Sequence, residues 1–181
     1  MKLLAEVSLL LRQREVPHAV IGAAALAVLG VARSTQDLDL LTTDRRVLVG
    51  SFWDPLARGG AKVEVHVGDI QDPIAGVVRI TREGDRPVDL LVGEAPWQGR
   101  VLAEAIPHDL GGASVPVANA VGLVLLKLYA GGPQDMWDIE QVLGLEPSPA
   151  ALLAAVDGRV GELPGRCRRL WRRAAATRRR G

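Results

Sequence analysis

Two aspartates two positions apart, Asp37 and Asp39, have the spacing that most directly suggests chemistry in this chain. They lie in the segment Asp-Leu-Asp-Leu-Leu-Thr, which alternates polar and apolar residues at its start, as a strand does. Side chains at positions i and i+2 of a strand point to the same face, with Cα atoms about 7 Å apart. We therefore expect both carboxylates to converge on one divalent cation or to flank two, while Leu38 and Leu40 face the core.

A third carboxylate from a neighbouring strand would complete a two-metal site, and Asp89 is the favoured candidate. It stands between Val88 and Leu90 in an otherwise apolar strand, where a lone acid is costly unless it is paired or binds a metal. Glu64 is the alternative, but its strand alternates regularly, so Glu64 fits a solvent-facing position. Three such carboxylates suit Mg²⁺ or Mn²⁺ together with the phosphates of a nucleoside triphosphate.

Residues suited to binding phosphate precede the aspartate pair. Gly22 and Ala23 open a short helix, and free N–H groups at such a turn can hold a triphosphate. Arg33, Ser34 and Thr35 stand just before the strand, where a guanidinium and two hydroxyls can reach phosphate oxygens. The alternative is a glycine turn, a core helix and a surface strand without a ligand. The full order of these parts favours phosphate and metal chemistry.

Further charged and aromatic residues lie in the second half of the chain. Lys127 interrupts an apolar helix, and it either extends to solvent or directs its charge at phosphates. Asp135 and Asp138 share a helix face near the helix start, where they would stabilise its positive end. Trp137 and Trp171 are expected to pack, although Trp171 lies among arginines and could stack on RNA.

The order of elements predicts an α/β fold, with a small mixed sheet flanked by helices and a helical C-terminal part. The α/β core covers residues 1–118, and a helical subdomain with a basic tail covers residues 119–181. Residues 45–56 are expected to form one helix. The single cysteine, Cys167, cannot form an internal disulfide and fits a reducing compartment, so we expect a cytoplasmic protein. The charged residues near the N-terminus do not fit a signal peptide or a membrane span, so no membrane partner is expected.

Charge is distributed unevenly along the chain. From Arg159 onward there are nine arginines and one acid, Glu162, against a net charge of +1 for the whole chain. This basic pole either binds phosphates, as RNA would supply them, or forms a solvated helix face.

Together these motifs resemble the DNA polymerase β-type nucleotidyltransferase superfamily, and within it the AbiEii-like and minimal nucleotidyltransferases. Several of those proteins are toxin or antitoxin partners. The resemblance covers roughly residues 17–143. The residues that carry it are Gly22, Arg33, Thr35, Asp37, Asp39, Val88-Asp89-Leu90, Lys127, Asp135 and Asp138.

The resemblance implies a metal-dependent enzyme that moves a nucleoside monophosphate from an NTP such as ATP to a hydroxyl of RNA, tRNA, protein or a small molecule, and releases pyrophosphate. It assigns metal binding and catalysis to Asp37, Asp39 and Asp89, with Asp89 also assisting deprotonation of the acceptor. It assigns nucleotide contacts to Gly22, Ala23, Arg33, Ser34, Thr35, Lys127, Asp135 and Asp138, and the last two would position the nucleotide or order Lys127.

Two departures from the family pattern are present, and the first of them, Ala23, motivates an alternative function. Ala23 stands where the family usually has Gly or Ser, and Gly132-Pro133-Gln134 stands where toxin-like members often have a basic residue. The alternative is a catalytically inactive nucleotidyltransferase-like binding partner, such as a toxin–antitoxin subunit.

Overall fold

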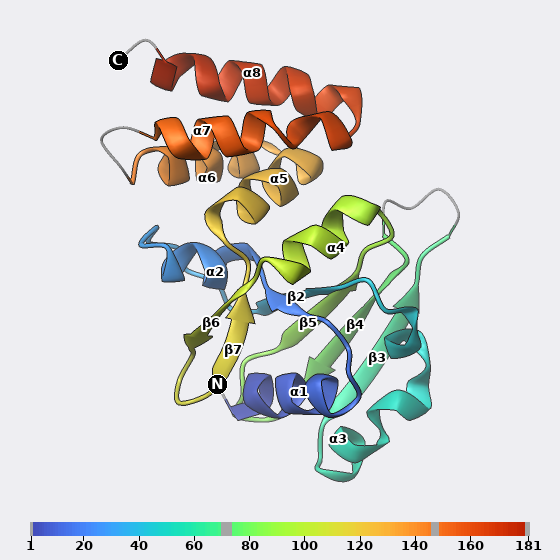
Figure 1. The fold of residues 1–181 in the computed structure, drawn as a ribbon. Coiled ribbons are helices and arrows are strands. Elements are labelled where there is room, and N and C mark those ends of the chain that lie inside the picture. Colours follow the sequence, from blue (N-terminus) through green and yellow to red (C-terminus); the bar gives the residue numbers. More distant parts are fainter. Residues whose placement is uncertain (1, 70–73, 146–148, 180–181) are drawn as a thin grey trace. The chain divides into compact units, whose positions relative to one another are not determined.

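The computed structural model describes residues 2–69, 74–145 and 149–179, which form an α/β protein with a seven-stranded mixed sheet (Figure 1). The strands are β1 (Ala19–Val20), β2 (Leu38–Thr42), β3 (Lys62–Val67), β4 (Gly76–Thr81), β5 (Val88–Val92), β6 (Ile106–Asp109) and β7 (Ser114–Val117). Their order is β3-β4-β5-β2-β1-β7-β6. The β2–β5 and β1–β7 pairs are parallel, and the other neighbours are antiparallel. The predicted fold class is confirmed.

The chain divides into two compact units. One unit comprises Met1–Ala24 with Ser34–Ala118, and the other comprises Ala25–Arg33 with Asn119–Gly181. The helices are α1 (Lys2–Gln13), α2 (Gly22–Val28), α3 (Asp54–Arg58), α4 (Pro96–Ala103), α5 (Ala120–Ala130), α6 (Pro133–Leu143), α7 (Ala150–Asp157) and α8 (Gly165–Arg179). We call the unit formed by Met1–Ala24 and Ser34–Ala118 the sheet unit, and the unit formed by Ala25–Arg33 and Asn119–Gly181 the helical unit. Residues 25–33 thus cluster with the helical unit, although the sequence division places them in the α/β core.

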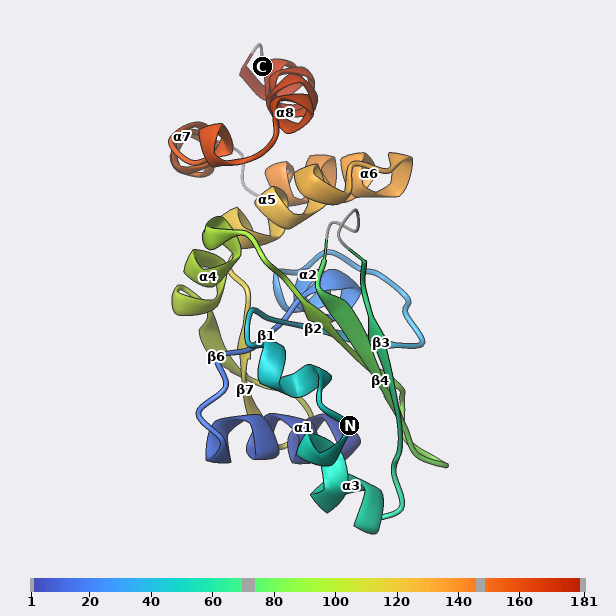
Figure 2. The ribbon, with the colours of Figure 1, turned by 90° about the vertical axis from the view of Figure 1, so that its right-hand side faces the viewer.

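The central strands of the sheet unit have one apolar and one polar face. Val78 and Ile80 on β4 alternate with less buried neighbours, as do Val88 and Leu90 on β5, and all four are fully buried. Helices α1 and α4 and the segment 45–58 lie along one side of these strands (Figure 2). Burial of apolar side chains between these helices and the strands is the main stabilising term for the unit. The polar residues of the same strands therefore share the opposite face.

The segment after β2 differs from the single helix expected for residues 45–56. It forms two short 3₁₀ turns, Arg45–Leu48 and Gly50–Trp53, before α3 begins. Asp44 accepts a hydrogen bond from the backbone N–H of Arg46 and so caps the first turn. Pro55 stands in the first turn of α3, where its missing N–H costs nothing. Strand β6 was not expected from the sequence.

Among the described residues, no helix is long and apolar enough to cross a membrane.

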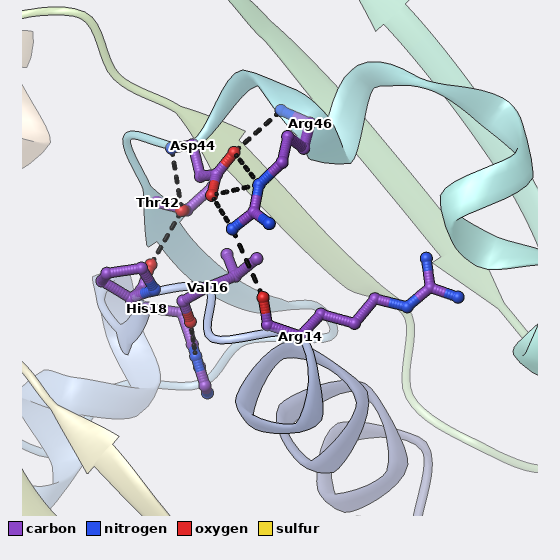
Figure 3. A network of polar contacts seen from close by, with 7 residues as sticks. Arg14, Val16, His18, Thr42, Asp44 and Arg46 are labelled. Carbon is purple, nitrogen blue, oxygen red and sulfur yellow. Dashed lines mark hydrogen bonds and ion pairs between the residues drawn. The ribbon is translucent and has the colours of Figure 1, made fainter.

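A polar network fixes the end of β2 to the segment that follows α1 (Figure 3). The Thr42 hydroxyl donates to the carbonyl of Pro17 at 2.7 Å and accepts from the N–H of Asp44 at 3.2 Å. The Arg46 guanidinium pairs with the Asp44 carboxylate at 2.6 Å and donates to the carbonyl of Arg14 at 3.3 Å. These bonds satisfy loop carbonyls that β pairing leaves open, and they hold the start of β1 against β2.

His18 is a structural residue of the same region. Its Nδ1 donates to the carbonyl of Val16 at 2.9 Å, which leaves Nε2 to accept from the hydroxyl of Ser8 at 2.8 Å. Burial lowers the pKa of His18, while the Val16 carbonyl opposes that shift. The ring therefore serves as a neutral hydrogen-bonding link.

Candidate active site

The register of the sheet brings three of the polar-face residues to the same level. Asp39 on β2 is the partner of Asp89 on parallel β5, and Arg79 on β4 is the partner of Asp89 on the other side. Directly paired positions on adjacent strands point to the same face, so Arg79, Asp89 and Asp39 form a row on one face of the sheet with Asp89 in the middle. Asp37 lies one residue before β2 begins, on the side of Asp39.

Arg79 bridges two of the three predicted carboxylates. Its Nη1 donates to Asp89 Oδ2 at 2.8 Å, and its Nη2 lies 3.5 Å from Asp37 Oδ2. Sequence reasoning did not identify this residue. The alternation Val-Val-Arg-Ile-Thr would have placed Arg79 on the polar face, but only the pairing register shows that it lies beside Asp89.

Asp89 is the acid of this site whose side chain is largely buried and only partly paired. Its side chain is 16% exposed, and its Oδ1 atom is buried without a hydrogen-bond partner. Burial raises the pKa of Asp89, the charge of Arg79 opposes this, and the charge of Asp37 adds to it. A buried carboxylate oxygen without a partner is uncommon in a folded protein, and it is available to a cation or a proton.

The turn at Gly22 packs against the Asp39 carboxylate. Gly22 has a φ of +63°, and a Cβ atom added there would overlap the Asp39 side chain. The N–H of Ile21 also donates to the Asp39 carbonyl at 2.9 Å. Glycine is therefore required for two reasons, the left-handed backbone and the close approach. The predicted pairing of glycine turn and aspartate strand is present in the sheet unit.

The remaining predicted residues of the sheet unit have more ordinary surroundings. The Thr35 hydroxyl donates to the carbonyl of Asp37 at 2.9 Å, so it shapes the turn before β2. Ser34 is exposed, and Ala23 is buried. The side chain of Glu64 on β3 is 42% exposed and pairs with Lys62 at 2.7 Å, as expected for a solvent-facing position.

The fit of this site to a metal ion is partial. Over the described residues, no three carboxylate, imidazole or thiol groups are gathered closely enough to hold an ion. Mg²⁺ prefers oxygen ligands. The Oδ1 atom of Asp89 has no hydrogen-bond partner, and Asp39 lies directly opposite Asp89 on the neighbouring strand, so both acids can supply such ligands. The guanidinium of Arg79 already supplies positive charge between Asp37 and Asp89. A metal ion would have to displace it.

A second charged group lies within the helical unit. Lys127 Nζ lies 2.8 Å from both Asp135 Oδ1 and Asp138 Oδ2, and Arg33 Nη1 lies 3.2 Å from Asp138 Oδ1. Asp138 is fully buried, and Asp135 also accepts from the N–H of Gly132 at 3.0 Å. Burial lowers the pKa of Lys127, but its two carboxylate partners outweigh that effect and raise it. Lys127 therefore does not extend to solvent, and the two acids hold it in place.

Of the two tryptophans expected to pack, Trp171 is buried and Trp137 is not. Trp171 is 2% exposed and its Nε1 donates to Asp157 Oδ1 at 2.7 Å, so stacking of Trp171 on RNA is wrong. Trp137 is 42% exposed, so it is not the packing residue expected. On α8 the helical period turns Cys167 and Trp171 inward, whereas Arg168 and Arg172 face solvent. Arg180 lies outside the described residues.

No protein-family model matches this sequence, and no curated protein matches it. Solved structures do match. ANT(2″)-Ia in complex with adenylyl-2″-tobramycin has a TM-score of 0.55 at 18% identity, covering 87% of this chain and 97% of that one. An antigenic nucleotidyltransferase-like protein from Paracoccidioides brasiliensis has a TM-score of 0.51 at 20% identity, covering 93% and 90%.

The lincosamide antibiotic adenylyltransferase LnuA, with lincomycin bound, has a TM-score of 0.51 at 14% identity, covering 80% of this chain and 97% of that one. At these identities the likeness concerns the fold, and function has to be argued from the site. The likeness in fold extends over 80–87% of this chain and 97% of these two adenylylation-related structures. This chain therefore has the nucleotidyltransferase fold.

Proposed function

We propose that this protein is a metal-dependent nucleotidyltransferase that moves a nucleoside monophosphate from an NTP to a hydroxyl acceptor. The observation that carries the proposal is the pairing of Asp39 with Asp89 on adjacent parallel strands, beside a Gly22 turn that abuts the Asp39 carboxylate. Two aligned acids beside a glycine turn place oxygen ligands for a metal and the N-terminus of a short helix close together. The shared fold supports the same conclusion.

In the proposed reaction the acceptor oxygen attacks the α-phosphorus of the NTP. The bond from that phosphorus to the bridging oxygen breaks, and pyrophosphate leaves. Bound Mg²⁺ or Mn²⁺ would neutralise phosphate charge and acidify the acceptor hydroxyl. Asp37, Asp39 and Asp89 would hold the ion. The raised pKa of Asp89 suits it to take the acceptor proton at its unpartnered Oδ1.

The helical unit would serve the nucleotide. Lys127 and Arg33 are the cations that the resemblance assigns to phosphates, and Asp135 and Asp138 hold them in a fixed arrangement. A guanidinium and an ammonium restrained by carboxylates lose little conformational entropy when they bind an anion. This assignment stays a prediction, as do the AbiEii-like subtype and a toxin–antitoxin role.

Transfer of label from an α-³²P NTP tests the proposal, with the wild type compared with Asp39→Asn and Glu64→Gln. Both substitutions remove one charge and keep the volume, but Glu64 is exposed on β3 and paired with Lys62. We expect Asp39→Asn to lower the transfer rate by at least about 100-fold, since it removes a metal ligand, and Glu64→Gln to leave it unchanged. Equal labelling by the wild type and Asp39→Asn would refute the catalytic assignment. Loss of labelling in Glu64→Gln alone would show that the catalytic carboxylate is Glu64 on β3.

The acceptor is tested in the same assay. Bulk tRNA, protein and small molecules are the acceptors that the sequence suggests. Tobramycin and lincomycin are suitable small hydroxylated compounds, because two proteins of the same fold are described with adenylylated tobramycin or with lincomycin. The basic tail favours RNA, since polyphosphate backbones bind arginine-rich surfaces. We expect labelled tRNA rather than labelled tobramycin.

A second candidate function is a catalytically inactive nucleotidyltransferase-like binding partner. The observation that favours it is Arg79, whose guanidinium already bridges Asp37 and Asp89. Ala23, in place of the usual small polar or glycine residue, points the same way. Calorimetry with Mg²⁺ and an NTP separates the two functions. Absence of binding at millimolar nucleotide would favour the inactive partner, and binding that Asp39→Asn abolishes would favour the enzyme.

A further inference from the structure

A hollow within the helical unit has features of a ligand site that the proposed reaction does not use. Its volume is about 410 Å³, within the range of small-molecule pockets. Trp137 and Gln141 of α6 line it, with Leu145, the loop 30–32 after α2 and Arg178 of α8. All of these lining residues belong to the helical unit.

Two large apolar side chains of the hollow are exposed to water. Trp137 is 42% exposed and Leu145 is 43% exposed. An exposed indole beside a leucine loses its contact with water when a flat apolar ligand covers it. The guanidinium of Arg33 lies 6.0 Å from the centroid of the Trp137 ring and is itself paired with buried Asp138. This pair fixes the indole from one side and so reduces the entropy that stacking would cost.

The polar part of the lining sets the chemistry of the ligand. Gln141 carries both a donor and an acceptor, which suits the edge of a heterocyclic base. Arg178 adds a guanidinium, whose head can contact phosphate or stack on a base. Among the described lining residues there is no carboxylate. A polycationic ligand such as an aminoglycoside is therefore disfavoured, and a neutral or anionic aromatic ligand is favoured.

We propose that this hollow binds a nucleobase, stacked against Trp137, with Gln141 at its polar edge and Arg178 at an attached phosphate. The choice of a nucleotide ligand rests on the proposed function, whereas the preference for a flat, uncharged or anionic ring follows from the lining alone. The base can belong to the donor NTP or to the end of an RNA acceptor. The ligand chemistry is the same in both cases.

Fluorescence quenching tests the site without any metal. Trp53, Trp97 and Trp171 are all at most 3% exposed, so Trp137 is the indole that a solute in water reaches. Adenosine and cytidine, titrated in EDTA, should quench the wild-type emission in a saturable way. Calorimetry should show binding weakened by about 5- to 150-fold in Trp137→Ala, which is the usual cost of losing a stacking platform. Trp137→Phe keeps an aromatic face and should stay within about threefold.

A matched arginine pair controls for general charge. Arg178→Gln should weaken binding of AMP more than binding of adenosine, because adenosine has no phosphate. Arg172→Gln removes the same charge from the exposed face of α8, outside the lining, and should change neither. No saturable quenching in the wild type, or equal affinities in the wild type and Trp137→Ala, would overturn the proposal.

Competition experiments and KM values show whether the bound base belongs to the donor NTP or to the RNA acceptor. If it belongs to the donor, NTPs compete with adenosine and Trp137→Ala raises the KM for NTP. If it belongs to the acceptor, a short single-stranded RNA competes better than any mononucleotide and the KM for RNA rises. Asp39→Asn should keep nucleoside binding while it loses transfer. A wild type that binds adenosine but transfers nothing would refute the proposed function and leave the base site standing.

Discussion

Replacing Arg79 with methionine is expected to destabilise the metal-free protein and to strengthen its binding of Mn²⁺. The 2.8 Å contact with Asp89 is a charge-assisted hydrogen bond, of a kind worth about 1.5–3 kcal/mol when sheltered. Arg79 is 38% exposed, so solvent screening reduces this to about 1–2 kcal/mol, and the 3.5 Å contact with exposed Asp37 adds little. For a chain of this size the melting temperature in EDTA should fall by about 2–8 °C.

A cation that displaces the guanidinium from the wild-type site has to break the Arg79–Asp89 contact, at the same cost of about 1–2 kcal/mol. Its removal should therefore raise Mn²⁺ affinity, measured by calorimetry, by about 5- to 30-fold. Arg82→Met is the control, because Arg82 lies just after the same strand and pairs with Glu6 at 2.7 Å, outside the site. That variant should lose stability with no change in Mn²⁺ affinity. Weaker or unchanged Mn²⁺ binding in Arg79→Met would refute competition between the guanidinium and the ion.

Two further expectations concern the turn and the histidine. In urea unfolding, Gly22→Ala should lower the free energy of unfolding by at least about 1 kcal/mol more than Gly84→Ala does. Both glycines have positive φ, but of the two only Gly22 lies against Asp39. Equal losses of stability in the two variants would contradict the overlap with Asp39. Burial holds the pKa of His18 below its usual 6.5, so the unfolded chain takes up the proton first and stability should fall as pH drops from about 7 to 5. His18→Gln should flatten that part of the pH profile, and an unchanged slope would assign it to other groups.

Much of the site could be predicted because its residues break local patterns. Asp89 stands out as an acid in an apolar strand, and Asp37 with Asp39 as a same-face pair. The chain order also identifies the glycine turn before them. Arg79 could not be found in this way, because an arginine in an alternating strand looks like any solvent-facing residue. Its partner depends on a hairpin register that sequence periodicity does not specify.

The fold shows the same division between local and non-local information. The buried faces of β4 and β5 follow from alternation, and Asn119 caps α5 by accepting from Gly122 N–H at 2.8 Å, as its type predicts. Strand β6 contains Pro107 and is largely exposed, so it lacks both β-propensity and an apolar face. The pairing of Arg33 with Asp138 joins segments far apart in sequence, and no local rule anticipates it.

The discontinuous make-up of the helical unit affects how the nascent chain can fold. Leu26 and Val31 are buried and belong to that unit, yet the rest of the unit follows only after the whole of Ser34–Ala118. At ribosomal rates these apolar residues wait roughly 4–17 s before Asn119 is made. During synthesis they form a short exposed apolar segment that a chaperone can bind, and the helices from α5 onward later bury it. A stop codon after Ala118 would leave that peptide permanently uncovered, so we expect such a fragment to aggregate rather than survive as an independent domain.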